Sequence, residues 1–185
     1  MTHMIEVRRH SRRVRGGQRL TQWGVSLARA VGERSGPFDR VVTSPLARCV
    51  ETAVAMGFAV GDVEPRLAGA DGLGETFPGI AEVDWAAGYG GMARLIAQGG
   101  ALATFARQQA GIWHELARGL PVGGRLLIVT HGGAFLDGAA ITCLPQVAHA
   151  TWGPTSRYCE GVRLTCAGDT CLDCEVLRVA QGEPA

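Results

Sequence analysis

The four consecutive aliphatic residues at positions 126–129 constrain the fold of this chain more than any other feature. Leu-Leu-Ile-Val without a polar interruption is the pattern of a strand buried on both faces, as in a parallel sheet. Parallel strands need crossover connections, and the chain accordingly alternates between short apolar runs and segments with helical periodicity. The sequence therefore predicts an α/β fold, a three-layer sandwich in which helices flank a mostly parallel central sheet.

The other expected elements follow the same alternation. Further strands are expected at residues 4–8, 41–43 and 58–63, and helices at about 84–97, 102–118 and 133–143. Thr21 is expected to cap the helix after the first loop, and Ser44 the helix that Pro45 begins. A β-hairpin at residues 161–166 and 174–179 is expected to close the fold.

Length and composition indicate one globular unit. A chain of 185 residues with 46% hydrophobic and 19% charged residues fits a single domain over residues 1–185. No segment approaches the ~18–20 consecutive apolar residues of a membrane span. The apolar run at the N-terminus is too short for a signal peptide, so a cytoplasmic location is expected by default.

The chain contains no lysine and no asparagine, and all 18 of its basic side chains apart from histidine are arginines. Schiff-base chemistry on a lysine, a pyridoxal-phosphate anchor and a phosphate loop completed by lysine are therefore excluded. The formal charge of only +1 argues against nucleic acid as a partner. Any anion site must be built from arginine, histidine, hydroxyls and backbone N–H groups.

Four of the six cysteines lie in the C-terminal hairpin region, whereas Cys49 and Cys143 fit apolar helical patterns as core thiols. Cys171 and Cys174 have the spacing of half a zinc site, but no second pair with that spacing accompanies them. Buried free thiols on the hairpin strands are therefore favoured over a metal site or a disulfide.

Basic side chains follow three of the expected strands. Arg9 and His10 end the first strand, Arg48 follows the second, and His131 follows the strand at residues 126–129. Ligands of parallel α/β sheets bind beyond the carboxyl ends of the strands, so these side chains are expected to converge. The expected site is one that binds an anion.

These residues belong to four ordered blocks, which run from Ile5 to about Gly133. The blocks are Arg9-His10, Leu20-Thr21-x-x-Gly24, Ser44-Pro45-Leu46-x-Arg48-x-x-Glu51-Thr52-Ala53 and Val129-Thr130-His131-Gly132-Gly133. In this order they resemble the histidine phosphatase superfamily, branch 1, with its phosphoglycerate mutase-like fold. The resemblance implies that His10 is a nucleophile that becomes phosphorylated. It also implies that Arg9, Arg48 and His131 form the phosphate pocket.

The implied roles are chemically reasonable. A neutral imidazole can attack phosphorus and later leave, and arginine forks bind the oxygens of a phosphoryl group. Two arginines with a protonated His131 would supply the positive charge, so no metal and no other cofactor is predicted. Arg13, Ser11 and Ser44 are candidates for further contacts to the substrate.

The resemblance also implies a general acid, because many members of that family place a carboxylate soon after the third strand to protonate the leaving group. Glu75 is the first choice, followed by Glu82 and Asp71, and a fourth possibility is that none of them acts. Two aromatic residues nearby, Trp85 and Tyr89, are expected to pack within the protein rather than to contact substrate.

The predicted function is hydrolysis of phosphate monoesters, or of phosphohistidine, by a metal-independent phosphatase that forms phospho-His10. The expected partner is a small phosphorylated substrate or a phosphohistidine protein, with no nucleic acid and no membrane. The alternatives are a mutase of the phosphoglycerate type and a weakly catalytic, phosphate-binding regulatory module. The resemblance argues against the mutase, because the Thr-x-x-Asn element of mutases cannot exist in a chain without asparagine.

Overall fold

The computed structural model describes residues 2–180 and contains a six-stranded sheet with the order β3-β2-β4-β1-β5-β6. Strands β1 to β4 are mutually parallel, and the hairpin of β5 and β6 joins β1 in antiparallel orientation. The bounds are β1 Thr2–Arg9, β2 Arg40–Thr43, β3 Asp62–Val63, β4 Arg125–Thr130, β5 Gly161–Ala167 and β6 Thr170–Leu177. The predicted α/β class with a mostly parallel sheet is confirmed.

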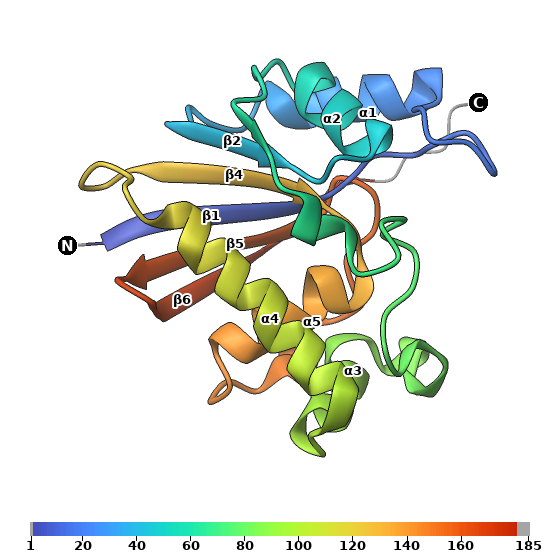
Figure 1. The fold of residues 1–185 in the computed structure, drawn as a ribbon, viewed down its shortest axis with the longest axis vertical. Coiled ribbons are helices and arrows are strands. Elements are labelled where there is room, and N and C mark those ends of the chain that lie inside the picture. The colour runs from blue at the N-terminus through green and yellow to red at the C-terminus, as the bar shows by residue number, and fades with distance from the viewer. Residues whose placement is uncertain (1, 181–185) are drawn as a thin grey trace.

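Helices cover both faces of this sheet (Figure 1). One layer consists of α1 (Gln22–Gly32) and α2 (Ala47–Ala55). The other consists of α3 (Gly88–Ala97), α4 (Gly100–Ala117) and α5 (Asp137–Cys143). Single 3₁₀ turns occur at Pro65–Ala68, Ile80–Glu82, Trp85–Ala87, Gly133–Phe135 and His149–Trp152.

Strand β4 is buried on both faces, as its apolar sequence predicts. Leu126 and Ile128 belong to the core cluster that includes residues of α4 and α5. Leu127 and Val129 belong to the separate cluster that includes residues of α1 and α2. Successive strand residues point to opposite faces, so one short strand joins both layers. Burying each such side chain contributes about 1.5–3 kcal/mol.

The two expected helix caps have different outcomes. The Thr21 hydroxyl accepts a hydrogen bond from the Gly24 amide at 3.0 Å, so α1 is capped as predicted. The prediction for Ser44 is wrong, because α2 begins at Ala47 and lacks a side-chain cap. Ser44 instead extends the pairing of β2 with β4, since its amide donates to the Val129 carbonyl at 3.0 Å.

Two other elements are shorter than their sequence patterns suggest. β3 covers only Asp62–Val63, the two residues that pair with β2, and Phe58 lies before it, edge-on to Phe38 with ring centroids 5.0 Å apart. The helix expected at residues 84–97 is divided into a 3₁₀ turn and α3. The division falls at Gly88, whose φ of +57° is incompatible with continuing the preceding turn.

The cysteines of the hairpin are not all free thiols, contrary to prediction. Cys166 and Cys171 form a disulfide, whereas Cys143, Cys159 and Cys174 remain free, as does Cys49. The pairing arises because Cys166 lies directly opposite Cys171 in the hairpin ladder.

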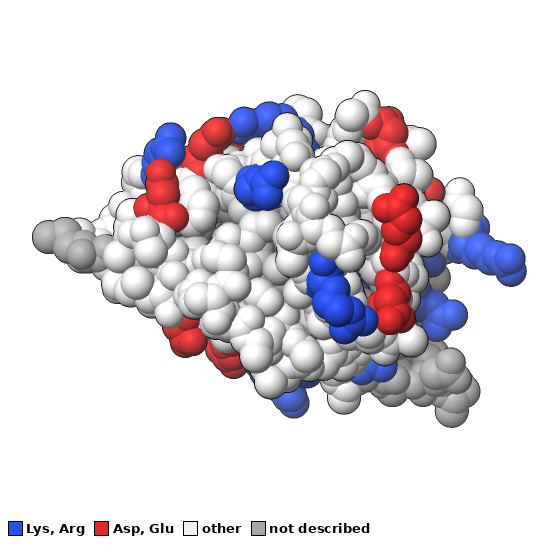
Figure 2. Space-filling model, turned by 90° about the horizontal axis from the view of Figure 1, so that it is seen from below, with Lys and Arg blue, Asp and Glu red and all other residues white. Residues whose placement is uncertain are grey.

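No helix within residues 2–180 is both long enough and apolar enough to cross a membrane. On the face of the molecule shown in Figure 2, basic and acidic side chains are scattered among uncharged ones and form no single basic patch. This distribution agrees with the near-neutral formal charge of the chain.

Candidate active site

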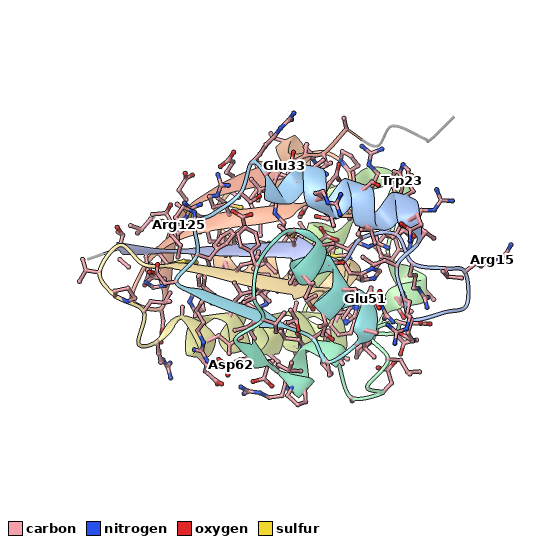
Figure 3. All side chains as sticks on the ribbon, turned by 90° about the horizontal axis from the view of Figure 1, so that it is seen from above. Arg15, Trp23, Glu33, Glu51, Asp62 and Arg125 are labelled. Atoms are coloured by element: carbon pink, nitrogen blue, oxygen red, sulfur yellow. A yellow bond between two sulfur atoms is a disulfide. The ribbon has the colours of Figure 1, made fainter. Side chains whose placement is uncertain are left out.

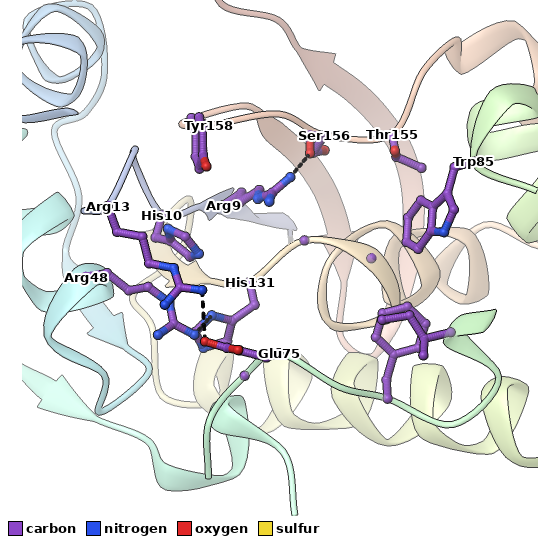
Figure 4. Close-up of a pocket in the computed structure, with 15 residues that line it drawn as sticks. Arg9, His10, Arg13, Arg48, Glu75, Trp85, His131, Thr155, Ser156 and Tyr158 are labelled. Atoms are coloured by element: carbon purple, nitrogen blue, oxygen red, sulfur yellow. Dashed lines mark hydrogen bonds and ion pairs between the residues drawn. The ribbon is translucent and has the colours of Figure 1, made fainter. Parts of the chain in front are cut away.

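A cavity of about 410 Å³ opens at the carboxyl ends of β1 and β4 (Figure 4). The expected convergence of side chains occurs there, because adjacent parallel strands end at the same edge of the sheet. The lining residues are Arg9, His10, Arg13, Arg48, Gly74, Glu75, Phe77, Ile80, Trp85, His131, Gly132, Gly133, Thr155, Ser156 and Tyr158.

His10 is buried at the end of β1 and has a defined tautomer. Its Nδ1 lies 2.8 Å from the carbonyl oxygen of Ser11, which can only accept, so Nδ1 carries the proton and Nε2 keeps a lone pair. Burial lowers the pKa of His10 well below its ordinary value of 6.5, and the charges of Arg9 and Arg48 lower it further. The imidazole is therefore neutral and nucleophilic at neutral pH.

Arg9 is anchored on one side of His10. Its guanidinium donates to the Ser156 carbonyl at 2.9 Å and lies 5.1 Å from the centroid of the Tyr158 ring. Its Nε is buried and has no hydrogen-bond partner within residues 2–180. A β-carbon at Gly132 would lie 3.0 Å from Cδ of Arg9, so glycine at this position leaves room for the arginine. Arg9 thus retains donor capacity for an anion.

Arg48 lies on the first turn of α2 and is almost completely buried. Its guanidinium donates to the side chain of Gln18 and to the carbonyl of Leu73, which brings the loop of residues 69–79 to the site. Burial lowers the pKa of Arg48, yet a guanidinium stays charged under physiological conditions. Arg48 is therefore a fixed cation in the wall of the cavity.

His131 follows β4 and faces His10, with ring centroids 5.5 Å apart. Its Nδ1 lies 3.4 Å from a guanidinium nitrogen of Arg48, which can only donate, so Nδ1 is the acceptor. The proton of the neutral ring is therefore on Nε2, which donates to Ser44 Oγ at 2.9 Å. Burial, followed by the charges of Arg48, Arg9 and Arg13, lowers the pKa of His131 to about 3. The expected protonated His131 is therefore not the form present in the free site.

Arg13 and Glu75 form an ion pair at 2.9 Å across the cavity (Figure 4). Both side chains remain partly exposed, and Arg13 also donates to the Gly17 carbonyl at 2.8 Å. Arg15, only two positions away, extends into solvent from the same loop and does not line the cavity (Figure 3).

The structure distinguishes among the three candidate carboxylates. Only Glu75 lines the cavity. Asp71 is bound within its own loop, where it accepts hydrogen bonds from the Leu73 amide at 2.9 Å and from the Thr76 hydroxyl. Glu82 is exposed on its 3₁₀ turn. Glu75 is therefore the carboxylate available to a bound phosphate ester.

A family model described as the histidine phosphatase superfamily (branch 1) matches residues 6–170. The chain belongs to the histidine phosphatase superfamily. This membership confirms the resemblance seen in the sequence and the predicted enzyme class, a phosphatase of the hydrolase type. No curated protein matches the sequence significantly.

Solved structures share the fold of this histidine phosphatase at low sequence identity. Phosphoserine phosphatase from Entamoeba histolytica is 16% identical with a TM-score of 0.65, over 97% of this chain and 98% of that one. The open reading frame Rv3214 of Mycobacterium tuberculosis is 23% identical with a TM-score of 0.59, over 95% and 96%. A mycobacterial glucosyl-3-phosphoglycerate phosphatase is 19% identical with a TM-score of 0.55, over 88% and 92%.

Two serines that were predicted to contact the substrate have hydroxyl groups that bond to other parts of this phosphatase. The Ser11 hydroxyl donates to the Gly24 carbonyl at 2.7 Å, and the Ser44 hydroxyl is the partner of His131. Neither residue lines the cavity. Their hydrogen bonds connect His10 and His131 to the surrounding elements, so we assign them positioning rather than binding roles.

The apolar side of the cavity was not predicted from the sequence. Trp85, expected to pack internally, is 46% exposed and lines the cavity beside Phe77, with ring centroids 6.3 Å apart. Tyr89 is buried as expected and lies 3.1 Å from the Ser156 hydroxyl. Tyr158, whose ring centroid is 6.1 Å from that of His10, has no distinguishing local pattern. It reaches the site only through the return of the chain into β5.

One group of metal-ligand type side chains occurs in the part of the chain that the structure describes, at His114, Cys166 and Cys171. None of these residues lines the cavity around His10. The expectation that catalysis requires no metal thus remains a prediction.

Proposed function

We propose that this histidine phosphatase hydrolyses phosphate monoesters of small molecules through a phospho-His10 intermediate and without a metal ion. One observation carries the proposal. The unprotonated Nε2 of a neutral His10 is available in a cavity that three arginines line, Arg9, Arg13 and Arg48. A nucleophile and fixed positive charges are the two things that phosphoryl transfer needs most.

In the first step, His10 Nε2 attacks phosphorus and the bond from phosphorus to the leaving-group oxygen breaks. Arg9 and Arg48 bind the equatorial oxygens, on which negative charge is spread in the transition state. Glu75 in its protonated form gives its proton to the departing oxygen. The Ser11 carbonyl stabilises the positive charge that develops on the ring, because it accepts the hydrogen bond from Nδ1.

In the second step, a water molecule attacks phosphohistidine and the nitrogen–phosphorus bond breaks. The Glu75 carboxylate, left by the first step, accepts a proton from that water, and Nε2 recovers its lone pair. The products are inorganic phosphate, neutral His10 and protonated Glu75, so the cycle closes without another reactant.

The shape of the cavity supports an organic phosphate ester as the substrate. Charged side chains surround His10, whereas Phe77, Ile80 and Trp85 provide an apolar wall beyond them. Two solved structures of the same fold are described as phosphatases of phosphoserine and of glucosyl-3-phosphoglycerate, both small esters. A mutase is disfavoured by the absence of asparagine, and a purely phosphate-binding module would have no use for Glu75 in the cavity.

The test compares wild-type protein with His10→Ala on a panel of sugar phosphates, phosphoserine, phosphoglycerates, nucleotides and phosphohistidine peptides. We expect the variant to lose at least about 10³-fold in kcat/KM. Wild-type protein quenched during turnover should carry an acid-labile phosphoryl group that is stable in base. Arg15→Ala, which removes an arginine outside the cavity, is the control for a general loss of charge.

Activity that survives in His10→Ala would contradict the mechanism. Tight phosphate binding by wild-type protein without turnover of any ester would favour the regulatory module instead. Hydrolysis of phosphohistidine peptides alone would replace the small-ester substrate with a protein substrate.

A further inference from the structure

A second group of reactive side chains lies at the end of the sheet opposite the active site. β1 ends at Arg9 beside the cavity, and at its other end His3 pairs with Cys166 of β5. The turn between β5 and β6 is therefore remote from the carboxyl ends of β1 and β4, as Figure 1 shows. The mechanism proposed above uses none of the side chains near this turn.

The β5–β6 hairpin aligns two cysteines by means of an irregularity. Thr165 pairs with Asp173, so a regular ladder would place Leu172 opposite Cys166. A register shift after Thr165 instead places Cys171 opposite Cys166. Directly opposed residues in antiparallel strands project to the same face. Both side chains consequently point into the core, with exposed fractions of 0% and 6%.

A histidine of the helix packed over this pair lies close to both sulfurs, and a third cysteine lies beside that histidine. A ring nitrogen of His114, on α4, and the sulfurs of Cys166 and Cys171 all lie within 4.8 Å of one another. The sulfur of Cys143, at the end of α5, is 4.0 Å from Nε2 of His114. Tetrahedral zinc holds such donor atoms about 3.5–3.8 Å apart, so small adjustments suffice for His114, Cys166 and Cys171. The Cys143 sulfur lies outside this group and must turn toward it to become a fourth ligand.

Two imidazole nitrogens near this group are buried without partners. Nδ1 of His114 makes no hydrogen bond within residues 2–180, and neither does Nε2 of His3, the residue paired with Cys166. A buried polar atom without a partner destabilises the folded protein. Coordination of a metal ion by His114 would give its ring a defined orientation and a bonding partner.

We propose that the reduced protein binds one zinc ion here through the thiolates of Cys143, Cys166 and Cys171 and one ring nitrogen of His114. Three sulfurs and one nitrogen form a closed tetrahedral ligand set of the structural type. Such a site would tie α4, α5 and the hairpin together. The site does not depend on the proposed phosphatase mechanism, since it shares no residue with it.

The disulfide and the metal site are alternative states of the same cysteine pair. A phosphine reductant breaks the Cys166–Cys171 bond, takes up the oxygen of one water molecule as phosphine oxide and leaves two thiols. Zinc binding then releases the thiol protons as the metal–sulfur bonds form. The oxidised pair has no thiolates to offer, so only the reduced form is a ligand.

Metal binding is measured by titration with Co²⁺ on the whole 185-residue chain, reduced with a phosphine and freed of metal. We expect one equivalent to produce the d–d bands of tetrahedral cobalt and a thiolate charge-transfer band, both lost when Zn²⁺ is added. Zinc should also raise the Tm of the reduced protein, because it binds only the folded state.

Three variants decide which side chains are ligands. His114→Gln and Cys171→Ser should each weaken Co²⁺ binding at least about 100-fold, since loss of even an outer-sphere partner commonly costs 10–100-fold. Cys159→Ser should bind Co²⁺ like wild type, because Cys159 is a buried thiol of the other core cluster. Circular dichroism of each variant establishes that it is folded.

The proposal is overturned if reduced, folded wild-type protein gives no tetrahedral cobalt spectrum. It is also overturned if His114→Gln, which keeps every cysteine, retains the full spectrum. Equal binding by the oxidised protein would show that Cys166 and Cys171 are not ligands.

Discussion

The carboxylate of Glu75 lies 2.9 Å from the guanidinium of Arg13, and both side chains line the cavity that contains His10. The ion pair joins the loop after β1 to the loop before the 3₁₀ turn at Ile80–Glu82, two segments more than sixty positions apart. It therefore holds a carboxylate near the proposed phosphate site. An arriving anionic substrate must therefore compete with Glu75 for Arg13.

Glu75→Gln should distinguish a general acid from a merely structural carboxylate. With alkyl phosphates, whose leaving oxygen needs a proton, we expect kcat to fall by about 10²–10⁴-fold. With p-nitrophenyl phosphate, whose leaving group departs as a stable anion, the loss should be much smaller. The measurement is kcat for a series of esters of increasing leaving-group pKa. Glu82→Gln, on an exposed carboxylate outside the cavity, is the matched control. An equal loss for all esters would argue against proton transfer by Glu75.

His131 should make the protein less stable as the pH falls. Its pKa is about 3 in the folded protein and close to 6.5 when unfolded, so the unfolded state binds the proton more readily. The free energy of unfolding is unaffected by this group above pH 6.5 and declines as the pH falls from 6.5 toward 3. Between pH 6.5 and 3, His131 alone lowers the free energy of unfolding by up to about 1.4 kcal/mol for each pH unit. Urea denaturation at several pH values should show a shallower decline for His131→Gln, and identical slopes would refute the assignment.

Two glycines of one loop provide a test of active-site crowding. Gly74 and Gly72 both have positive φ, +62° and +66°, so alanine costs about 1 kcal/mol of backbone strain at either position. A β-carbon at Gly74 would overlap the ring of His131, whereas one at Gly72 would meet no described atom within 4 Å. Gly74→Ala should therefore lower kcat/KM by at least about 10-fold, a loss of about 1.4 kcal/mol. Gly72→Ala should lose stability alone, and equal kinetic losses in both variants would contradict this explanation.

Trp85→Ala should affect the choice of substrate rather than the chemical step. The indole is partly exposed beside Phe77, away from the charged residues around His10. For esters with an aromatic or bulky apolar leaving group we expect KM to rise about 5- to 10-fold, since an aromatic contact contributes about 0.5–1.5 kcal/mol. For the smallest esters KM and kcat should stay close to wild type. A fall in kcat for all esters would instead indicate a role near phosphorus.

The acidic limit of catalysis should lie below the range usual for a histidine nucleophile. Burial lowers the pKa of His10, so its neutral form persists to a pH well below 6.5. The kcat/KM profile, corrected for ionisation of the ester, should therefore show no loss near pH 6.5 that belongs to His10. An acidic limb centred at 6.5 that belongs to His10 would contradict the lowered pKa and mean that the ring is hydrated rather than buried.

Much of the fold and part of the site follow from local sequence patterns. The apolar run at residues 126–129 predicts β4. Arg9, His10 and His131 lie at or directly after the ends of β1 and β4 in the sequence, so predicting the strands also places these side chains. Parallel strands end at one edge of the sheet, so the convergence of these groups needed no tertiary information. The absence of lysine and asparagine also restricts the possible chemistry, whatever fold the chain adopts.

Tertiary structure alone decided which side chains share the cavity and how they are oriented. Glu75 lines the cavity whereas Asp71 bonds within its own loop, a difference between positions four residues apart in one irregular segment. No periodicity governs such a segment, so the direction of each side chain depends on long-range contacts such as Arg48 to Leu73. The pairing of Cys166 with Cys171 likewise depends on a register shift, which is set by packing of the whole hairpin. Strand and helix patterns are local, whereas register, side-chain direction and burial are properties of the packed molecule.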